Sequence, residues 1–437
     1  MSKKVYIQTF GCQMNVYDSE RLMGLLHSEG HTITKSEKEA DVIVLNTCSV
    51  REKAERRAWG RLSDLHRYKQ KNPDVMLVVA GCMAQRMGKD LAMELPYLDL
   101  ILGPDQIFQL PQLISNHRIP DKTAVYSSRE EFRSGNIWER EILPRRKTPF
   151  TSFVAISRGC DNFCSYCVVP FVRGPERNRP FAQIIDEVRQ IAESGAKEVC
   201  LLGQNVNSYR YEGKDFSDLL GMVNDRTEIE WIHFMTSHPK DLSDKLIDKI
   251  ASLPRVCEHI HLPLQSGSDR ILERMNRGYN SSDYLKRVER IKEKVENVSL
   301  TTDVIVGFPS ESEDDFRKTL VMMEKVEFDS AFMFRYSVRE GTQAAFFKDD
   351  VPEEEKLKRL NTLIQLQKKN SGLRNQRFMG KVLEVLVDGR SRRDKKKWKG
   401  KARTNHTVII ESNRDILGKI IHAKIKEADS YTLFGGV

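Results

Sequence analysis

Short β-branched and apolar runs alternate with longer helix-compatible stretches through most of the chain. The first three runs lie at residues 4–10, 41–46 and 75–80, and a stretch with helical periodicity follows each of them. Strands that alternate with helices in this way form parallel sheets. We therefore expect a parallel α/β domain of the flavodoxin-like type over residues 1–120.

The same alternation resumes at Phe153. Strands are expected at residues 153–157, 197–203, 230–236, 258–264, 299–306 and 329–336. Six such βα units are typical of an incomplete parallel barrel, a (β/α)6 core, with its functional residues at the carboxyl ends of the strands. We assign this core to residues 150–375 and interpret the polar segment 121–149 as a linker.

The pattern changes again near residue 380. Residues 381–389, 406–412 and 420–428 are short runs in which apolar and polar residues alternate. This pattern predicts a small antiparallel β-barrel, similar to the oligonucleotide-binding (OB) fold, over residues 376–437.

The composition argues against a membrane protein. Of the 437 residues, 39% are apolar and 30% are charged, and no run approaches the roughly 18 apolar residues that a spanning helix needs. The N-terminus lacks the apolar segment of a signal peptide, so we expect a cytoplasmic protein. The eight cysteines would stay reduced there, which makes them candidate metal ligands or core residues.

The net charge of +9 is concentrated at the C-terminal end. Residues 374–437 contain 16 basic and 7 acidic residues, whereas the residues before them are balanced. Charge confined to one module favours contact with a polyanion, and the alternative is a solvated lysine-rich loop. Trp398 would either stack on a base or lie exposed on that loop. The candidate RNA-binding residues are Lys395, Lys396, Lys397, Trp398, Lys399 and Lys401.

Three cysteines form a C-x-x-x-C-x-x-C motif after the first strand of the expected barrel: Cys160, Cys164 and Cys167. Three thiolates this close on one loop can each bind one iron of a cubane cluster and leave the fourth iron open for a substrate. A structural zinc site would need a fourth ligand, and no further Cys or His lies nearby in the sequence. The motif therefore favours an iron-sulfur cluster.

Three other cysteines, Cys12, Cys48 and Cys82, each follow a predicted strand of the first domain. Parallel strands end at one edge of the sheet, so these residues should converge in a second ligand site. Gly11 and Gly81 would let the backbone approach a bulky inorganic ligand. The remaining two, Cys200 and Cys257, are interpreted as buried core thiols.

These features resemble a known family. The C-x-x-x-C-x-x-C motif is similar to the signature of radical S-adenosylmethionine (SAM) enzymes, and the whole arrangement resembles the methylthiotransferase family over essentially the entire chain. That family joins a three-cysteine domain, a radical-SAM partial barrel and a C-terminal TRAM domain. The segments LLGQNVNSY (201–209), TSHP (236–239) and HLPLQSGSDRILERMNR (261–277) are similar to its tRNA-modifying branch.

The resemblance implies the chemistry. The C2–H of adenine is neither acidic nor electrophilic enough for acid-base or nucleophilic catalysis to install sulfur, so a radical is needed. The motif cysteines would hold a 4Fe-4S cluster that binds and cleaves SAM. The second group would hold an auxiliary 4Fe-4S cluster that carries the sulfur, and another SAM would supply the methyl group.

The same resemblance implies the partners. The substrate would be N6-(dimethylallyl)adenosine next to the anticodon, in the anticodon stem-loop of a tRNA. A flavodoxin or ferredoxin would donate electrons, and we expect a monomer without membrane association.

Five further residues are candidate SAM contacts. The family places an aromatic residue against the SAM adenine at the position of Tyr166. Gly203, Gln204, Gln265 and Ser266 end two of the expected barrel strands, and residues 304–311 resemble a further SAM-lining segment. The histidines at or near the barrel strands, His233, His238, His259 and His261, are interpreted as structural.

Two alternatives stay open. One is a related methylthiotransferase that acts on threonylcarbamoyl-adenosine in tRNA or on an aspartate of a ribosomal protein. The other is a non-catalytic iron-sulfur protein that binds RNA.

Overall fold

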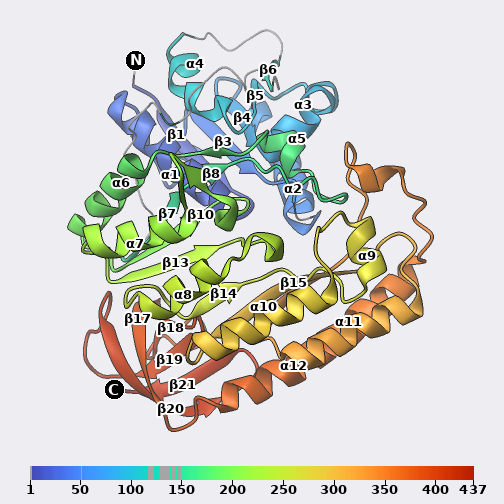
Figure 1. Ribbon diagram of the computed structural model, residues 1–437. Helices are drawn as coiled ribbons and strands as arrows, with labels where there is room; N and C mark the ends of the chain where they lie inside the picture. Colours follow the sequence, from blue (N-terminus) through green and yellow to red (C-terminus); the bar gives the residue numbers. More distant parts are fainter. Residues whose placement is uncertain (1, 51, 117–122, 128–137, 139–143, 145–148) are drawn as a thin grey trace. The chain divides into compact units, whose positions relative to one another are not determined.

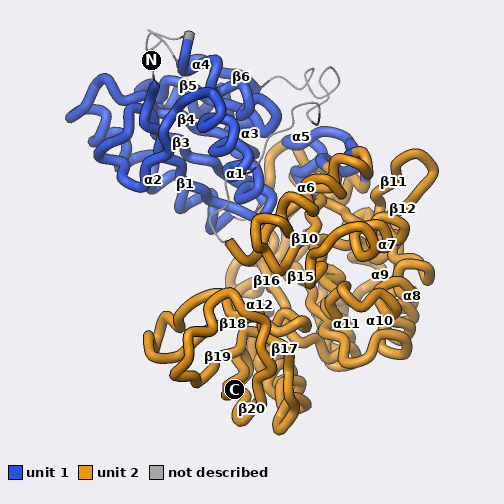
Figure 2. The backbone as a smooth tube through the Cα atoms, turned by 90° about the vertical axis from the view of Figure 1, so that its left-hand side faces the viewer, with its two compact units in different colours: residues 1–147, 158–161, 167–179 blue, residues 148–157, 162–166, 180–437 orange. Residues whose placement is uncertain are grey.

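The computed structural model describes residues 2–50, 52–116, 123–127, 138, 144 and 149–437 (Figure 1). The chain divides into two compact units (Figure 2). Unit 1 comprises residues 1–147, 158–161 and 167–179, and unit 2 comprises residues 148–157, 162–166 and 180–437. The expected linker at 121–149 falls largely outside the described residues. No described helix is long and apolar enough to cross a membrane.

Unit 1 contains a six-stranded parallel sheet with the order β2-β1-β3-β4-β5-β6. Its strands are β1 (Lys4–Thr9), β2 (Thr32–Ile33), β3 (Val42–Thr47), β4 (Met76–Gly81), β5 (Leu100–Leu102) and β6 (Ala124–Tyr126). Its helices are α1 (Gln13–Ser28), α2 (Glu52–Lys71), α3 (Cys82–Glu94), α4 (Leu110–Asn116) and α5 (Val169–Arg173). The three predicted strands are confirmed as β1, β3 and β4.

Helices cover both faces of this sheet because its central strands are apolar on both sides. In β3, Val44 packs in one buried cluster with Leu22 of α1, and its neighbour Leu45 packs in another with Leu62 of α2. Successive side chains of a strand point to opposite faces, so a continuous apolar run requires two covering layers. The result is the expected parallel α/β domain.

Unit 2 contains six parallel strands in two adjoining sheets, with the orders β13-β10-β7 and β14-β15-β16. They are β7 (Thr151–Ala155), β10 (Glu198–Leu202), β13 (Trp231–Met235), β14 (His259–His261), β15 (Ser299–Val306) and β16 (Ser330–Arg335). The covering helices are α6 (Phe181–Glu193), α7 (Phe216–Arg226), α8 (Asp244–Ser252), α9 (Asp269–Arg274), α10 (Ser281–Lys294) and α11 (Glu313–Val326). A short ribbon is formed by β11 (Arg210–Tyr211) with β12 (Lys214–Asp215), whereas β9 (Arg177–Asn178), which pairs with β8 (Ser157–Arg158), belongs to unit 1. All six predicted barrel strands are confirmed.

The long helix α12 (Glu353–Gln376) leads from the partial barrel into a closed five-stranded β-barrel. The barrel strands are β17 (Val382–Arg390), β18 (Trp398–Ala402), β19 (Thr407–Glu411), β20 (Ile420–Ala428) and β21 (Thr432–Gly436). The predicted small barrel is confirmed, although β19 and β21 pair in parallel rather than antiparallel fashion.

Trp398 corrects one expectation from the sequence. Its side chain is only 4% exposed and belongs to the core of the β-barrel, and the Arg390 guanidinium lies 3.4 Å from its ring centre. The residue begins β18, where alternate residues point inward. The indole therefore neither stacks on a base nor lies on an exposed loop, and both readings of Trp398 are wrong.

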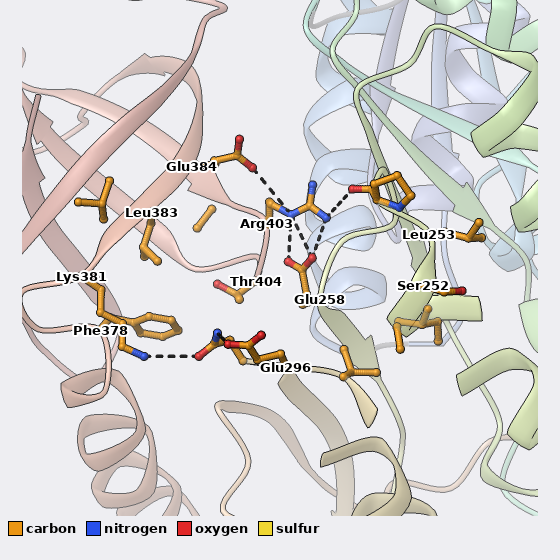
Figure 3. A pocket seen from close by; sticks show the side chains of 17 residues that line it. Ser252, Leu253, Glu258, Glu296, Phe378, Lys381, Leu383, Glu384, Arg403 and Thr404 are labelled. Atoms are coloured by element: carbon orange, nitrogen blue, oxygen red, sulfur yellow. Dashed lines mark hydrogen bonds and ion pairs between the residues drawn. The ribbon is translucent and has the colours of Figure 1, made fainter. Parts of the chain in front are cut away.

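The β-barrel packs against the amino-terminal ends of the core strands (Figure 3). Arg403 donates hydrogen bonds to both carboxylate oxygens of Glu258, at 2.7 to 3.1 Å, and to the carbonyl oxygens of Pro254 and Val256. A cavity of about 430 Å³ lies beside the ion pair of Arg403 with Glu258. Functional residues of such barrels gather at the opposite, carboxyl-terminal ends of the strands, so this cavity is not the candidate catalytic site.

Candidate metal and cofactor sites

The three cysteines of unit 1 lie at one edge of its sheet. The register pairs Thr9 with Asn46, and Thr47 with Gly81, so β1, β3 and β4 end at nearly the same level. Cys48 and Cys82 directly follow β3 and β4, and Cys12 caps α1 after β1. The predicted convergence is found, because the Cys12 side chain is hydrogen-bonded to that of Cys48, and Cys82 lies close enough to both to interact with them electrostatically.

Two glycines make this convergence possible. A Cβ atom on Gly11 would lie 2.7 Å from the Cβ atom of Cys48, and one on Gly81 would collide with the carbonyl oxygen of Thr47. Gly81 also has a φ of +94°, which side chains disfavour. The glycines therefore allow the loops to pack on one another, whereas the sequence suggested approach to a ligand.

The environment of these cysteines favours the thiolate of Cys12 and the neutral thiols of Cys48 and Cys82. The hydrogen bond from Cys48 and the positive charge of Arg173 lower the pKa of Cys12 to about 6 against the desolvation that raises it. The same hydrogen bond raises the pKa of Cys48, and burial raises the pKa of Cys82. Helices α1 and α3 both begin at this edge, and helix N-termini carry partial positive charge.

The motif cysteines lie on the loop between β8 and α5. Cys160 and Cys164 are buried and Cys167 is half-buried. Arg277 donates from Nη1 to the Sγ of Cys164 at 3.3 Å and to the hydroxyl oxygen of Tyr166 at 3.4 Å. Arg277 therefore orients two candidate residues of the loop.

Among the described residues, no three His, Cys, Asp or Glu side chains surround a single metal position. A cubane cluster does not require that geometry, because each cysteine binds a different iron atom. Soft thiolates, positive neighbouring groups and partial burial fit such a cluster at both cysteine groups.

Buried polar atoms without hydrogen-bond partners follow several strands of the partial barrel. The atoms are Ser157 Oγ, Asn205 Oδ1, Ser237 Oγ, His238 Nε2 and Gln265 Oε1. Each residue comes shortly after the end of β7, β10, β13 or β14. Unsatisfied buried polar atoms are costly, so their gathering at the carboxyl ends of the strands fits a polar ligand such as SAM.

The predicted SAM contacts separate into different roles. Gln265 has a φ of +66° and an unpartnered side-chain oxygen, whereas the fully buried hydroxyl of Ser266 accepts a hydrogen bond from the Ser268 amide within the loop. Gly203 directly follows β10, where a Cβ would lie 2.6 Å from Ser157 Oγ, and Gln204 comes next. The structure thus brings Gln265 and Gly203 to the candidate site and gives Ser266 a structural partner.

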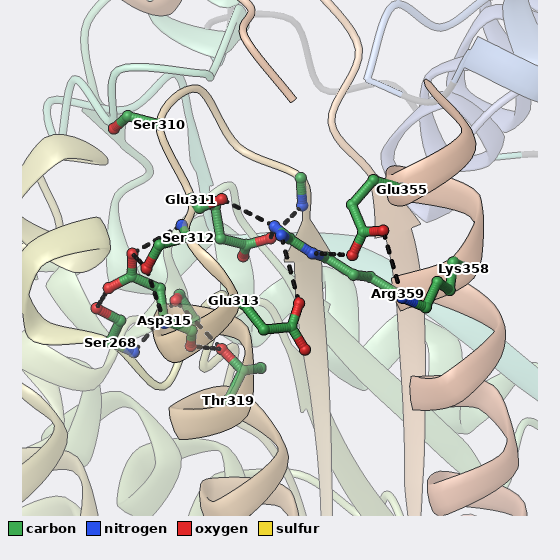
Figure 4. Close-up of polar contacts among 12 residues, drawn as sticks. Ser268, Ser310, Glu311, Ser312, Glu313, Asp315, Thr319, Glu355, Lys358 and Arg359 are labelled. Carbon is green, nitrogen blue, oxygen red and sulfur yellow. Dashed lines mark hydrogen bonds and ion pairs between the residues drawn. The ribbon is translucent and has the colours of Figure 1, made fainter. Parts of the chain in front are cut away.

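A polar network holds the segment 304–311, which comprises the end of β15 and the loop after it (Figure 4). Glu311 accepts hydrogen bonds from the Gly307 amide at 2.6 Å and from Arg359 of α12 at 2.8 Å. Asp315 accepts hydrogen bonds from the hydroxyls of Ser268 and Ser312 at 2.5 and 2.6 Å. The loops after β14 and β15 are therefore fixed to each other and to α12.

The four barrel histidines are buried, and only His238 has an unpartnered ring nitrogen among the atoms at the candidate SAM site. His259 and His261 each lie within hydrogen-bonding distance of the Thr301 hydroxyl. Burial lowers the pKa of His233 to about 3 and strongly lowers that of His238, so both rings are neutral. Cys200 and Cys257 are buried, as expected for core thiols.

The lysines of the basic run fall into two groups. Lys395 and Lys396 are exposed in a turn before β18. Lys397 and Lys399 form ion pairs with Glu411 and Asp388, at 2.8 and 3.0 Å. Lys401 is half-buried and donates to the Asn405 carbonyl at 2.9 Å.

Two arginines near the cysteines were not singled out from the sequence. Arg277 lies within the family-like segment 261–277, so a signal for it was present. Arg173 lies just after the cysteine motif, and nothing in the sequence shows that it reaches the other cysteine group.

Three family models match successive parts of the chain. "Uncharacterized protein family UPF0004" matches residues 4–103, the radical SAM superfamily residues 154–323 and the TRAM domain residues 376–437.

Curated proteins named tRNA-2-methylthio-N(6)-dimethylallyladenosine synthase are similar over the full chain. The protein from Caldicellulosiruptor saccharolyticus is 46% identical, with 100% of this chain and 93% of the relative covered. The protein from Clostridium botulinum strain Loch Maree is 44% identical, with 98% and 96% covered. The protein from Alkaliphilus oremlandii is 42% identical, with 100% and 93% covered.

Solved structures share the fold at low identity. The radical SAM methyltransferase TsrM from Kitasatospora setae has a TM-score of 0.56 at 14% identity, covering 79% of this chain and 77% of that chain. The cobalamin-dependent SAM radical enzyme OxsB has a TM-score of 0.55 at 14% identity, covering 84% and 56%.

Proposed function

Because the chain belongs to the tRNA-2-methylthio-N(6)-dimethylallyladenosine synthase family, we propose that it adds a methylthio group to C2 of N6-(dimethylallyl)adenosine next to the anticodon of tRNA. It is a radical-SAM methylthiotransferase that uses two 4Fe-4S clusters and SAM. The observation that carries the proposal is the pair of three-cysteine groups in one chain, since sulfur insertion needs a radical source and a sulfur carrier. The relatives' names do not favour the threonylcarbamoyl-adenosine, ribosomal-protein or non-catalytic alternatives.

The six cysteines are assigned as follows. Cys160, Cys164 and Cys167 would hold the SAM-binding cluster, and the chemistry this cluster would supply is the electron for reductive SAM cleavage. Cys12, Cys48 and Cys82 hold the auxiliary cluster.

The chain's own residues bind and orient the reactants. Arg277 fixes Cys164 and Tyr166, so that the tyrosine is held where an aromatic ring can face the SAM adenine. The unpartnered oxygens of Gln265 and Asn205 are available to donors on SAM. The Glu311–Arg359 contact keeps the loop after β15 in place during binding.

The remaining assignments are also part of this proposal. The domains are a methylthiotransferase domain at 1–120, a linker at 121–149, a radical-SAM core at 150–375 and a TRAM domain at 376–437. The TRAM domain contacts tRNA through its exposed lysines. The protein acts as a cytoplasmic monomer, and a flavodoxin or ferredoxin supplies the electrons.

Nucleoside analysis tests the activity. Mass spectrometry of tRNA from cells that lack the gene should show N6-(dimethylallyl)adenosine without its 2-methylthio derivative, and the gene should restore the derivative. In vitro, prenylated tRNA should be turned over markedly faster than unmodified tRNA, because the prenyl group would add apolar contact once the loop base is extruded into the site. Equal turnover of the two tRNAs would contradict the proposed substrate.

Iron content tests the two cysteine groups. Replacing either group by alanine should remove about four of about eight irons per chain. The variant without the motif cysteines should no longer cleave SAM, whereas the variant without Cys12, Cys48 and Cys82 should still form 5′-deoxyadenosine but no methylthio product. The double replacement of Cys200 and Cys257 by alanine is the matched control and should keep all the iron. An auxiliary-group variant with full iron content would refute the assignment.

A further inference from the structure

Arg173 is a buried arginine that faces the three-cysteine site of unit 1. It ends α5, is 3% exposed, and its guanidinium is hydrogen-bonded to Cys82 and interacts electrostatically with Cys12. All of these residues belong to unit 1.

The protein positions this guanidinium but does not neutralise it fully. Asp18 accepts a hydrogen bond from Arg173 Nη2 at 3.0 Å and is also paired with the buried Arg158. One carboxylate is thus shared between two guanidinium groups. Arg173 Nη1 is buried and has no hydrogen-bond partner among the described residues. A buried guanidinium in this state needs a further anionic partner.

Contacts on the backbone fix where the charge points. Arg177 donates to the Arg173 carbonyl at 3.1 Å and is paired with Asp105 at 2.8 Å. Val172, the residue before Arg173, packs with Val168 and Cys82 in a small buried cluster. The Arg173 side chain is therefore held next to the cysteines at its guanidinium by Asp18 and at its backbone by Arg177.

We propose that Arg173 is the charge partner of the cluster on Cys12, Cys48 and Cys82 and raises its reduction potential. This rests on the proposed function, which places a 4Fe-4S cluster there. One-electron reduction makes the cluster and its three thiolates more negative by one charge, so a fixed positive charge and a hydrogen bond to a ligating sulfur stabilise the reduced form. The N-termini of α1 and α3 act in the same direction.

Arg158 provides a matched control. It is as deeply buried as Arg173 and pairs with the same Asp18. The groups that act on its charge are Asp18, Asp105 and two other arginines, with no cysteine among them. Removing Arg158 disturbs the same ionic network without removing the charge that lies against the cysteines.

The experiment isolates the auxiliary cluster in the full-length chain. Cys160, Cys164 and Cys167 are replaced by alanine, and the protein is reconstituted with iron and sulfide. The midpoint potential is then measured by titration with dithionite, followed by electron paramagnetic resonance. Arg173→Gln, Arg173→Lys and Arg158→Gln are compared in this background.

We expect Arg173→Gln to make reduction at least tenfold less favourable, a shift of about 59 mV to more negative potential for one electron. Arg173→Lys should shift the potential less, because it keeps the charge but not the planar hydrogen-bonding group. Arg158→Gln should change the equilibrium constant for reduction of the auxiliary cluster less than threefold.

Four results would overturn the inference or its premise. An unshifted potential in Arg173→Gln with full iron content refutes it, as does an equal shift in Arg158→Gln. If Arg173→Gln loses its iron, Arg173→Met replaces it as the variant without the charge, and an unshifted potential there refutes the role. Absence of iron from the background protein with Arg173 intact would instead refute the proposed auxiliary cluster.

Discussion

The two groups of lysines in the C-terminal barrel should contribute unequally to tRNA binding. Lys395 and Lys396 are exposed, whereas Lys397 and Lys399 are already paired with Glu411 and Asp388. A lysine that binds phosphate releases condensed counterions, and a lysine with an internal carboxylate partner must first give up that partner. We therefore expect the phosphate contacts to come mainly from the exposed pair.

The size of the effect follows from counterion release. Each phosphate contact changes the slope of log K against log salt by about 0.7 to 0.9, so the double replacement of Lys395 and Lys396 by alanine should make the slope shallower by about 1.4 to 1.8. Over a fourfold rise in salt, binding by the unsubstituted protein should weaken roughly sevenfold to twelvefold more than binding by the variant.

The assay is tRNA binding by fluorescence anisotropy at four salt concentrations. The control is the double replacement of Lys397 and Lys399 by alanine, which removes the same formal charge but should change the slope by less than half as much. SAM cleavage without RNA should survive in both variants, because no cysteine is changed. Equal slope changes in the two variants would refute the distinction between exposed and paired lysines. Unchanged slopes in both variants would show that the basic run is a solvated surface loop that does not contact tRNA.

Three further predictions concern single residues. Trp398→Phe should leave tRNA affinity within about twofold because the indole is buried, while Trp398→Ala should lower the melting temperature through a core loss of about 3 to 5 kcal/mol; a large affinity loss in Trp398→Phe would restore base stacking. Gln265→Ala should weaken SAM binding about fivefold in equilibrium dialysis, since a hydrogen bond contributes about 1 kcal/mol, and unchanged binding would exclude this contact. Burial raises the pKa of Glu198 from 4.5 to about 7. Between these two pH values the Glu198 carboxyl is protonated in the folded protein and ionised in the unfolded chain. The melting temperature relative to Glu198→Gln should therefore fall as the pH rises from 5 to 8, and a constant difference would contradict the shift.

The sequence predicted the elements with strong periodicity and missed the short ones. Strands β1, β3, β4 and five of the six barrel strands were predictable because each is a run of five or more residues followed by a helix, whereas the three-residue β14 was recognised only as part of a longer apolar segment, residues 258–264. Strands β2, β5 and β6 have two or three residues, too few to show alternation. Strand β18 was hidden because its lysines alternate with Trp398, Gly400 and Ala402, so the run looked uniformly basic.

The candidate site was predictable wherever a residue's role is encoded in its immediate neighbours. The motif cysteines stand within eight residues, and the other three each follow a strand, so topology alone brings the latter together. The division between Gln265 and Ser266 was not predictable, because it depends on which side chain finds a partner in the folded loop. Contacts of this kind join segments that are distant in the sequence, and residue type does not reveal them.

Arg173 lies next to the cysteine motif in the sequence, but only the fold shows its contact with the other cysteine group. It lies six positions after Cys167, a proposed ligand of the SAM-binding cluster, yet its guanidinium faces Cys82 and Cys12. The segment 167–179 thus supplies a ligand to one proposed cluster and the charge partner of the other, and α5 sets the spacing between them. Because Asp18 fixes Arg173 through a buried ion pair, a displacement of this segment would change the charge next to the auxiliary cysteines.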